Sequence, residues 1–211
     1  MPLPRFIVTG VLSLLALNGD IRGQGADARV WHSYVHISLG RFLSDSQWEI
    51  SHPFYQEGGG VIWETITGHV ATGTVAGCGV EVAKGHLGAR FDFTFLPMDL
   101  ELDQSRQRID INAYCPELSL MVYPQAVGTG GWSTFFSLGG GAYFSGEDVM
   151  KSGLLVSGKL GLRSFVSERF GVGLALAVKS ILHHQVKIAE QIQKDLKTTS
   201  ALISIDLVYR I

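Results

Sequence analysis

Apolar and polar residues alternate with a period of two along several stretches of this chain. The clearest stretch is the last one, in which Ile203, Ile205, Leu207, Tyr209 and Ile211 alternate with Ser204, Asp206, Val208 and Arg210. The same period recurs over 87–95, 156–163 and 171–179. Because successive side chains of a β-strand point to opposite faces, the pattern predicts strands with one apolar and one largely polar face.

Eight strands of this kind are expected along the chain. They cover 29–42, 68–82, 86–97, 107–123, 131–145, 153–165, 169–182 and 199–211. The segment 59–67 also reads as strand, which leaves the start of the second strand open. Strands of about ten residues are long enough to cross a bilayer when they are tilted.

The connections between these strands alternate in length. Those at 83–85, 124–130 and 166–168 are short, whereas those at 43–67, 98–106, 146–152 and 183–198 are mostly longer and more polar. Short periplasmic turns and longer extracellular loops are typical of barrels in bacterial outer membranes. We therefore expect an all-β fold, an eight-stranded antiparallel up-and-down transmembrane β-barrel.

The fourth predicted strand changes phase along its length. Its polar positions are even up to Asn112 and odd from Glu117 onward, with Pro116 between them. Proline cannot donate to the hydrogen-bond ladder and is found at bulges or edges. A bulge near Cys115 and Pro116 would restore a single lipid-facing side, and the alternative is that the segment forms two strands.

If the apolar faces meet lipid, ten charged residues point into the lumen. They are the cations Arg90, Lys159, Arg163, Lys179 and Arg210 and the anions Glu81, Asp92, Asp110, Glu117 and Asp206. The interior of an eight-stranded barrel is only wide enough to be filled by side chains, and buried charges must be paired. We therefore expect a connected, neutral network that plugs the lumen rather than a wide pore.

A soluble lipocalin-like barrel would show the same alternation with its faces reversed. Composition favours the membrane, because 46% of the residues are hydrophobic and only 17% are charged, which is little for a water-facing exterior. The 26 glycines argue against a helical bundle, and no apolar run after the first twenty residues is long enough for a helical span. The net charge of −2 gives no indication of a nucleic-acid partner.

The N-terminal residues have the order of a secretory signal peptide. Arg5 is followed by an apolar stretch over 6–17 and by small residues at 23–25 and 26–28, where cleavage would occur. We expect a signal peptide over 1–28 and the barrel domain over 29–211. The alternative is that the first residues form a buried helix or strand of the mature fold.

One histidine–serine pair is the catalytic candidate. His36 and Ser38 lie two residues apart in the first strand and share a face, so that the imidazole could activate the hydroxyl. The pair looks similar to the His-x-Ser of small outer-membrane lipid A deacylases, but Leu39 replaces the asparagine that usually follows. Both side chains are also expected in the lumen, away from lipid. We therefore expect no enzymatic activity, with a lipid-modifying hydrolase as the alternative.

Cysteine and histidine patterns predict neither a metal site nor a cofactor. Cys78 and Cys115 could pair in an oxidising compartment, but two cysteines set no spacing pattern, and we interpret them as small apolar residues of the sheet. His183 and His184 are adjacent and would point to opposite faces of a strand.

Two strand–turn–strand segments resemble a known family. The stretch 158–163 followed by 167–174, and 79–82 leading to 87–91, resemble small outer-membrane β-barrel proteins of the OmpA transmembrane-domain and OmpX type. The resemblance covers most of the chain after 28 and is one of pattern. It departs at Ile211, because the family usually ends in an aromatic residue.

The resemblance implies a bacterial outer-membrane location and a non-enzymatic structural or surface-interaction role. The expected partners are outer-membrane lipids, and extracellular or envelope proteins that meet the loops 43–67 and 183–198. A narrow channel is a further alternative.

Overall fold

The computed structural model describes residues 30–44, 46–55, 61–71, 73–103, 108–127, 131–146, 152–183, 186–188, 191–193 and 196–211. The predicted signal peptide, 1–28, lies outside these residues. The strands are β1 (Trp31–Ser44), β2 (Gln47–Tyr55), β3 (Val61–Ala71), β4 (Gly73–Lys84), β5 (Leu87–Leu102), β6 (Arg108–Val122), β7 (Trp132–Ser145), β8 (Ser152–Phe165), β9 (Phe170–His183), β10 (Val186–Ile188), β11 (Gln191–Gln193) and β12 (Leu196–Arg210). None of the described residues forms a helix that is long and apolar enough to cross a membrane.

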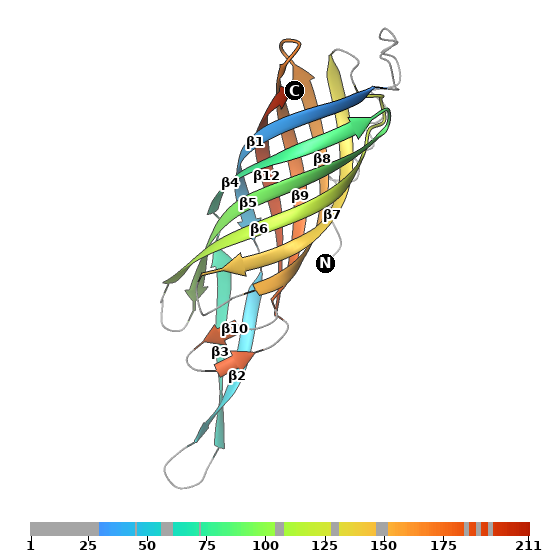
Figure 1. Ribbon diagram of the computed structural model, residues 1–211. Helices are drawn as coiled ribbons and strands as arrows, with labels where there is room; N and C mark the ends of the chain where they lie inside the picture. Colours follow the sequence, from blue (N-terminus) through green and yellow to red (C-terminus); the bar gives the residue numbers. More distant parts are fainter. Residues whose placement is uncertain are drawn as a thin grey trace.

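Eight of these strands close into a ring. The order around the ring is β1, β4, β5, β6, β7, β8, β9 and β12, and β12 pairs with β1 to complete it. All pairings are antiparallel, and Figure 1 shows the strands tilted around a common axis. The predicted fold class, an all-β, eight-stranded antiparallel barrel, is confirmed.

The two ends of the barrel differ. The end with the turn Gly85–His86, the turn 166–169 and the C-terminus is called the turn end here, and the opposite end is the loop end (Figure 1). Gly85 has a φ of 58°, a left-handed conformation that glycine adopts without steric cost, and this allows the tight turn between β4 and β5. The last strand is fixed at the turn end, where the Arg210 amide donates to the Arg169 carbonyl at 2.8 Å.

The outer face of the barrel is apolar over most of its height. Large side chains from every strand of the ring are exposed on it, among them Ile37, Val80, Phe93, Leu118, Leu138, Val156, Leu174 and Ile205. Aromatic side chains gather at the turn end, where Trp31, Trp132 and Phe170 are exposed and Phe170 packs against Tyr209 with ring centroids 5.0 Å apart. Apolar bands with aromatic borders are typical of membrane-spanning barrels.

The prediction of a loop over the first long connection, 43–67, is wrong for much of its length. It contains β2 and the first part of β3, which pair from Gln47 with His69 to Tyr55 with Val61. This two-stranded ribbon extends beyond the ring at the loop end, and only Gly68–Ala71 of β3 pair with β5 (Figure 1). The described part of the strand-like segment 59–67, from Val61 onward, therefore belongs to a hairpin and not to the second barrel strand.

The strand β5 is longer than the sequence pattern predicted, because it continues to Leu102. Beyond Phe95 the alternation persists with reversed polarity: Leu96, Met98 and Leu100 are buried in the lumen, and Asp99 and Glu101 point outward. The sequence prediction assumed that the apolar face always meets lipid, so it ended the strand where the polarity reverses. The backbone pairing of β5 with β6 continues beyond that point.

The predicted bulge at Cys115 and Pro116 is wrong. The register between β5 and β6 is continuous from Leu87–Val122 to Glu101–Arg108, and odd residues of β6 face the lumen throughout. Asp110 therefore points outward, and its side chain is 80% exposed. Charged residues are accommodated on the outer face at this level because the long strands β5 and β6 have passed beyond the apolar band.

A phase shift does occur, between β3 and β4. Ala71 pairs with Asp99 and Ala76 pairs with Phe95, so that four residues (72–75) lie opposite three (96–98). Val70 and Val75 both face the lumen, although one number is even and the other odd. One extra residue of this kind defines a β-bulge, and it marks where the ribbon leaves the barrel wall.

Candidate functional site

Glu81 of β4 and Arg163 of β8 meet in the lumen near the turn end. The guanidinium donates from Nη1 to Oε1 of Glu81 at 3.0 Å and from Nη2 to Oε2 at 2.6 Å, and the Tyr123 hydroxyl donates to the same carboxylate. Arg163 Cζ lies 5.0 Å from the ring centroid of Tyr34 and 5.5 Å from that of Phe135. Glu81 and Arg163 are 1% and 2% exposed, so each charge depends on the other.

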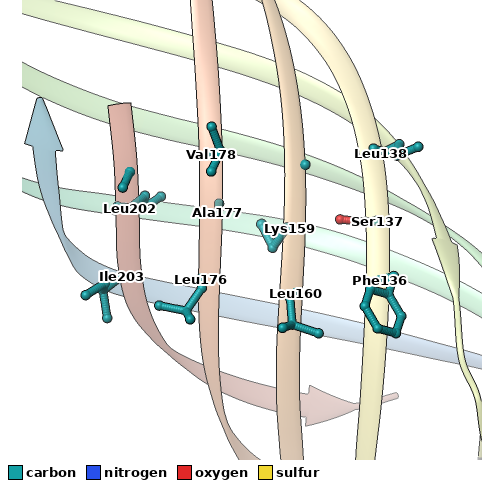
Figure 2. A pocket seen from close by; sticks show the side chains of 12 residues that line it. Phe136, Ser137, Leu138, Lys159, Leu160, Leu176, Ala177, Val178, Leu202 and Ile203 are labelled. Carbon is teal, nitrogen blue, oxygen red and sulfur yellow. The ribbon is translucent and has the colours of Figure 1, made fainter. Parts of the chain in front are cut away.

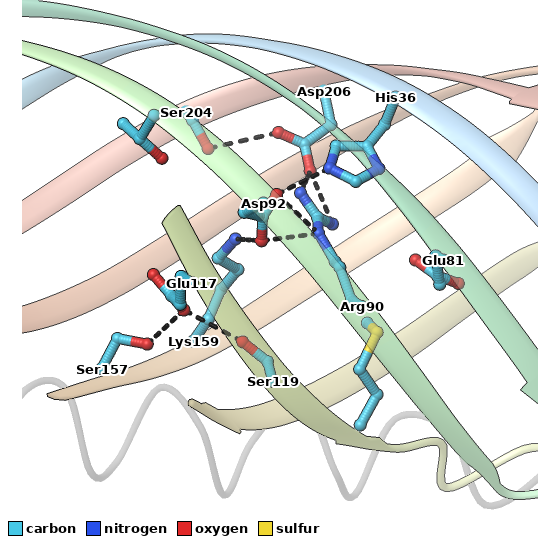
Figure 3. Close-up of polar contacts among 12 residues, drawn as sticks. His36, Glu81, Arg90, Asp92, Glu117, Ser119, Ser157, Lys159, Ser204 and Asp206 are labelled. Atoms are coloured by element: carbon cyan, nitrogen blue, oxygen red, sulfur yellow. Dashed lines mark hydrogen bonds and ion pairs between the residues drawn. The ribbon is translucent and has the colours of Figure 1, made fainter. Parts of the chain in front are cut away.

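Arg90 and Asp92 of β5 form the centre of the lumen (Figure 3). The Arg90 Nε donates to Asp92 Oδ2 at 2.9 Å, and its Nη2 donates to Asp206 Oδ2 of β12 at 3.2 Å. Lys159 of β8 reaches Asp92 Oδ2 with its Nζ at 3.1 Å, and His36 Nε2 of β1 lies 2.7 Å from Asp92 Oδ1. Four strands are therefore connected through one carboxylate and its partners.

A third group lies next to this centre. Lys179 of β9 donates from Nζ to Glu117 Oε2 of β6 at 2.8 Å. Ser119 donates to Glu117 Oε1 at 3.0 Å, and Ser157 donates to the same oxygen (Figure 3). Both oxygens of the buried Glu117 carboxylate thus accept hydrogen bonds, as a buried carboxylate requires.

Two glycines make room for these side chains in the narrow lumen. A Cβ at Gly79 would lie 2.6 Å from the imidazole of His36, and a Cβ at Gly139 would lie 2.9 Å from Glu117 Oε1. Both distances are too short for real atoms. Glycine at these two positions of the neighbouring strands therefore leaves the space that the side chains of the polar network occupy.

Toward the loop end the lumen becomes apolar. Its buried side chains form one cluster, which includes Phe42, Val75, Leu96, Met98, Leu100, Ile111, Cys115, Tyr143, Leu155 and Ile181. These residues come from β1 and β4 to β9 and fill the space between the charged centre and the loops. The lumen thus holds ion pairs at its centre and apolar side chains toward the loop end. A second apolar cluster, which includes Tyr34, Met121, Phe135 and Val208, lies near the turn end beside the pair of Arg163 and Glu81.

Neither a protein-family model nor a curated protein sequence matches this chain. Among solved structures it is similar to the outer membrane protein OprG from Pseudomonas aeruginosa, with a TM-score of 0.58 and 12% identity over 91% of this chain and 99% of that one. It is also similar to Neisserial surface protein A, with a TM-score of 0.47, 9% identity and coverage of 89% and 100%. The fold is that of a small outer-membrane β-barrel. At this level of identity the likeness concerns the fold alone.

In this outer-membrane-type barrel, most of the charges predicted for the lumen come together. Eight of them form the ion pairs described above, namely Glu81, Arg90, Asp92, Glu117, Lys159, Arg163, Lys179 and Asp206. Asp110 does not join them, because it lies on the outer face. Arg210 is half-buried at the turn-end mouth, where its Cζ lies 4.6 Å from the ring centroid of Phe165.

The histidine and serine of the first strand do not form a hydrogen-bonded pair in the barrel. His36 is 1% exposed in the lumen, and its Nε2 faces the Asp92 carboxylate. Its Nδ1 has no hydrogen-bond partner within the described part of the chain, Ser38 included. The imidazole is thus placed as a member of the charge network rather than beside a nucleophile.

The barrel wall also carries two cysteines and several hydroxyl groups. Cys78 is exposed on the outer face and Cys115 is buried in the lumen, and both are free thiols. Tyr123, Ser119 and Ser157, which bind the lumen carboxylates, were not predicted from the sequence. The parity of the serines would have placed them on the lumen face, but parity does not show which carboxylate a hydroxyl will reach.

Proposed function

We propose that this chain is a non-enzymatic barrel of the bacterial outer membrane, closed to ions, that acts through the segments at its loop end in a structural or surface-interaction role. The observation that carries the proposal is the filled lumen. Ion pairs that bridge the walls occupy its centre, one apolar cluster lies toward the loop end, and a second lies near the turn end. An interior packed in this way leaves no wide hydrated path, in line with the size of an eight-stranded barrel.

The apolar outer face supports the location. Phe91, Leu118, Leu174 and Ile205 are between 45% and 62% exposed, which would be costly in water over a whole barrel wall. Eight charged side chains lie inside instead, and each of these eight has an oppositely charged partner. A soluble barrel would need this arrangement reversed, with apolar side chains throughout its interior and charges on its outer face, whereas here the centre of the lumen is charged.

The ribbon of β2 and β3 supports a role at the surface. It continues the sheet past the ring, and β2 is its outermost strand (Figure 1). A two-stranded hairpin is at most marginally stable alone, and an edge strand offers unpaired backbone groups to another chain. Such a ribbon is suited to binding extracellular or envelope proteins.

A lipid-modifying hydrolase is the less favoured reading, because His36 lies inside the barrel and is engaged with Asp92. A lipid substrate outside the wall would not reach it. Measuring the acylation of lipid A and phospholipids in membranes with and without the protein tests this part of the proposal. An acylation change that depends on His36 would replace the proposal with the enzymatic alternative.

Conductance of single barrels in planar bilayers tests the closed lumen. The purified protein, shown to be folded by heat-modifiable gel migration, is expected to give no large and stable current steps. The control is a variant with Leu96→Ala, Leu100→Ala and Ile111→Ala, which empties part of the loop half of the lumen while keeping the ion pairs. Stable currents from the unaltered protein would favour a channel instead.

A further inference from the structure

A hollow of about 620 Å³ lies on the outer face of β7, β8, β9 and β12 (Figure 2). Two rows of outward residues, aligned by strand pairing, form its surface. One row runs through Leu138, Gly158, Val178 and Ala201, and the other through Phe136, Leu160, Leu176 and Ile203.

Small residues in the first row produce the depression. Gly158 has no side chain and Ala201 has only a methyl group. Leu138 of β7, by contrast, is 76% exposed and projects from the wall. A Cβ at Gly158 would meet only Leu138 Cδ2, at 3.6 Å, so the glycine is not required by packing inside the wall. The floor and sides of the hollow are apolar, and it is continuous with the apolar band around the barrel.

The border of the hollow toward the loop end is polar. On β12 the outward residues after Ala201 in this direction are Thr199 and Lys197, and both are exposed. The Thr199 hydroxyl lies 3.4 Å from the Ser180 hydroxyl of β9. Lys197 is four residues from Ala201, or about 13 Å along an extended strand. Exposed Arg41 of β1 pairs in register with Ile203, about 20 Å from Lys197 along the strand, so it lies beside the hollow and not at this border.

Lys197 and Arg41 have no ion pair within the described part of the chain. The lumen cations at positions 90, 159, 163 and 179, by contrast, each have a carboxylate partner. An outward cation at the edge of an apolar band is suited to the phosphate of a lipid headgroup. The hydroxyls of Thr199 and Ser180 lie between Lys197 and the hollow.

We propose that the hollow binds an acyl chain of one phosphorylated lipid, whose phosphate is held at the polar border by Lys197. The chain lies over Gly158 and Ala201 and is flanked by Leu138 and Ile203. The proposal rests on the membrane location given under the proposed function and adds a defined lipid site to it. The binding of the chain comes from packing against a shaped wall, since lipid tails surround the barrel everywhere.

A second copy of the barrel fits this surface less well. A barrel wall is convex overall, so a neighbouring barrel would leave the hollow unfilled, whereas a flexible chain can follow it. A two-fold contact would also place the same patch of both copies face to face. Arg41 and Lys197 would then approach their own counterparts, and like charges repel.

Titration of the folded barrel with phosphatidylglycerol, followed by native mass spectrometry in a non-ionic detergent, tests the site. Lys197→Gln is expected to weaken binding about fivefold, the effect of one cation at a membrane surface, and Arg41→Gln is expected to weaken it less, because Arg41 lies beside the hollow and far from Lys197. Gly158→Leu fills the hollow and is expected to weaken binding at least about fivefold. Diacylglycerol with the same chains lacks the phosphate, and its binding is expected to be insensitive to the two charge changes.

Two matched variants serve as controls. Ala76→Leu introduces the same leucine side chain on the exposed outer face of β4, and Lys84→Gln removes an exposed cation at the turn end. Both variants are expected to bind like the unaltered protein. Equal losses in the controls, equal affinity for both lipids, or undiminished binding by Gly158→Leu would overturn the proposal. A dimer of the unaltered protein that Gly158→Leu separates into monomers would also overturn the proposal.

Folding of every variant is checked by heat-modifiable migration, and Ala201→Leu replaces Gly158→Leu if that variant does not fold. The outcome is separate from that of the conductance experiment. A barrel that conducts ions but binds the lipid selectively would refute the closed lumen alone, and a silent barrel without lipid preference would refute the lipid site alone.

Discussion

Arg163 and Glu81 connect opposite walls of the barrel through two parallel hydrogen bonds. β4 and β8 are four positions apart in a ring of eight strands, so the pair spans the lumen. The fork of the guanidinium matches the two oxygens of the carboxylate, a geometry that lysine cannot reproduce. This cross-link fixes the separation of the two walls near the turn end.

Breaking this pair should destabilise the barrel strongly. Glu81→Ala leaves Arg163 buried without its carboxylate, and we expect a loss of about 3–5 kcal/mol in the free energy of unfolding. The double variant Glu81→Leu with Arg163→Met should recover part of this loss, because no unpaired charge remains. Urea unfolding in detergent micelles or lipid vesicles measures both. If the loss in the free energy of unfolding of the double variant equals the sum of the losses of the two single variants, the two residues are not coupled.

Asp206→Ala should cost less than Glu81→Ala. Arg90 loses one carboxylate but keeps Asp92, which accepts from its Nε at 2.9 Å. We expect a loss of about 1–3 kcal/mol, the range for an unsatisfied polar group rather than for an isolated charge. The same unfolding measurement compares the two variants. A larger loss for Asp206→Ala would mean that the central pairs, and not Glu81 with Arg163, dominate the lumen.

Replacement by alanine should affect stability at one glycine of β8 and not at another. A Cβ at Gly161 would overlap the ring of Phe135 in the lumen, whereas a Cβ at Gly158 meets only Leu138 on the outer face, at 3.6 Å. We expect Gly161→Ala to destabilise the barrel by about 1–3 kcal/mol and Gly158→Ala to have little effect. Thermal unfolding on heat-modifiable gels ranks the two variants. Equal behaviour would contradict the assignment of faces on β8.

An arginine on the outer face should be tolerated at the loop end and not in the apolar band. Phe93 is 42% exposed on the outer face of β5, and Phe93→Arg should cost about 2–4 kcal/mol if it lies near the bilayer midplane. Asn112→Arg, on the outer face of β6 beside exposed Asp110, should cost much less. Folding into lipid vesicles from urea compares them. Similar folding of both variants would show that the band does not contact lipid.

The loop end should face the cell exterior. Protease added to intact cells is expected to cut within 43–67 or 183–198, since long connections of outer-membrane barrels lie outside the cell. The turns at 83–85 and 166–168 should be cut only after the outer membrane is permeabilised. Cleavage in those turns on intact cells would reverse the proposed orientation.

The sequence by itself determined the strand count of the ring, the antiparallel order and the sorting of most charges to the inside. These features follow from a period of two, which is local and has only two phases, so Arg90, Asp92 and Asp206 could be placed on one face from their spacing alone. Short turns such as 83–85 fixed which strands are neighbours.

Only the tertiary structure decided which charges meet, where the phase shifts, and where the polarity of the lumen changes. The partners Arg163 and Glu81 are 82 residues apart, and their meeting depends on the closure of the ring. The phase of β6 was misread because Asp110 lies on the outer face beyond the apolar band, where charge is tolerated. The bulge between Val70 and Val75 follows from the departure of the ribbon from the wall. Periodicity reports the two faces of a strand, but the medium that each face contacts changes along the barrel, and this depends on the height of every strand relative to its neighbours.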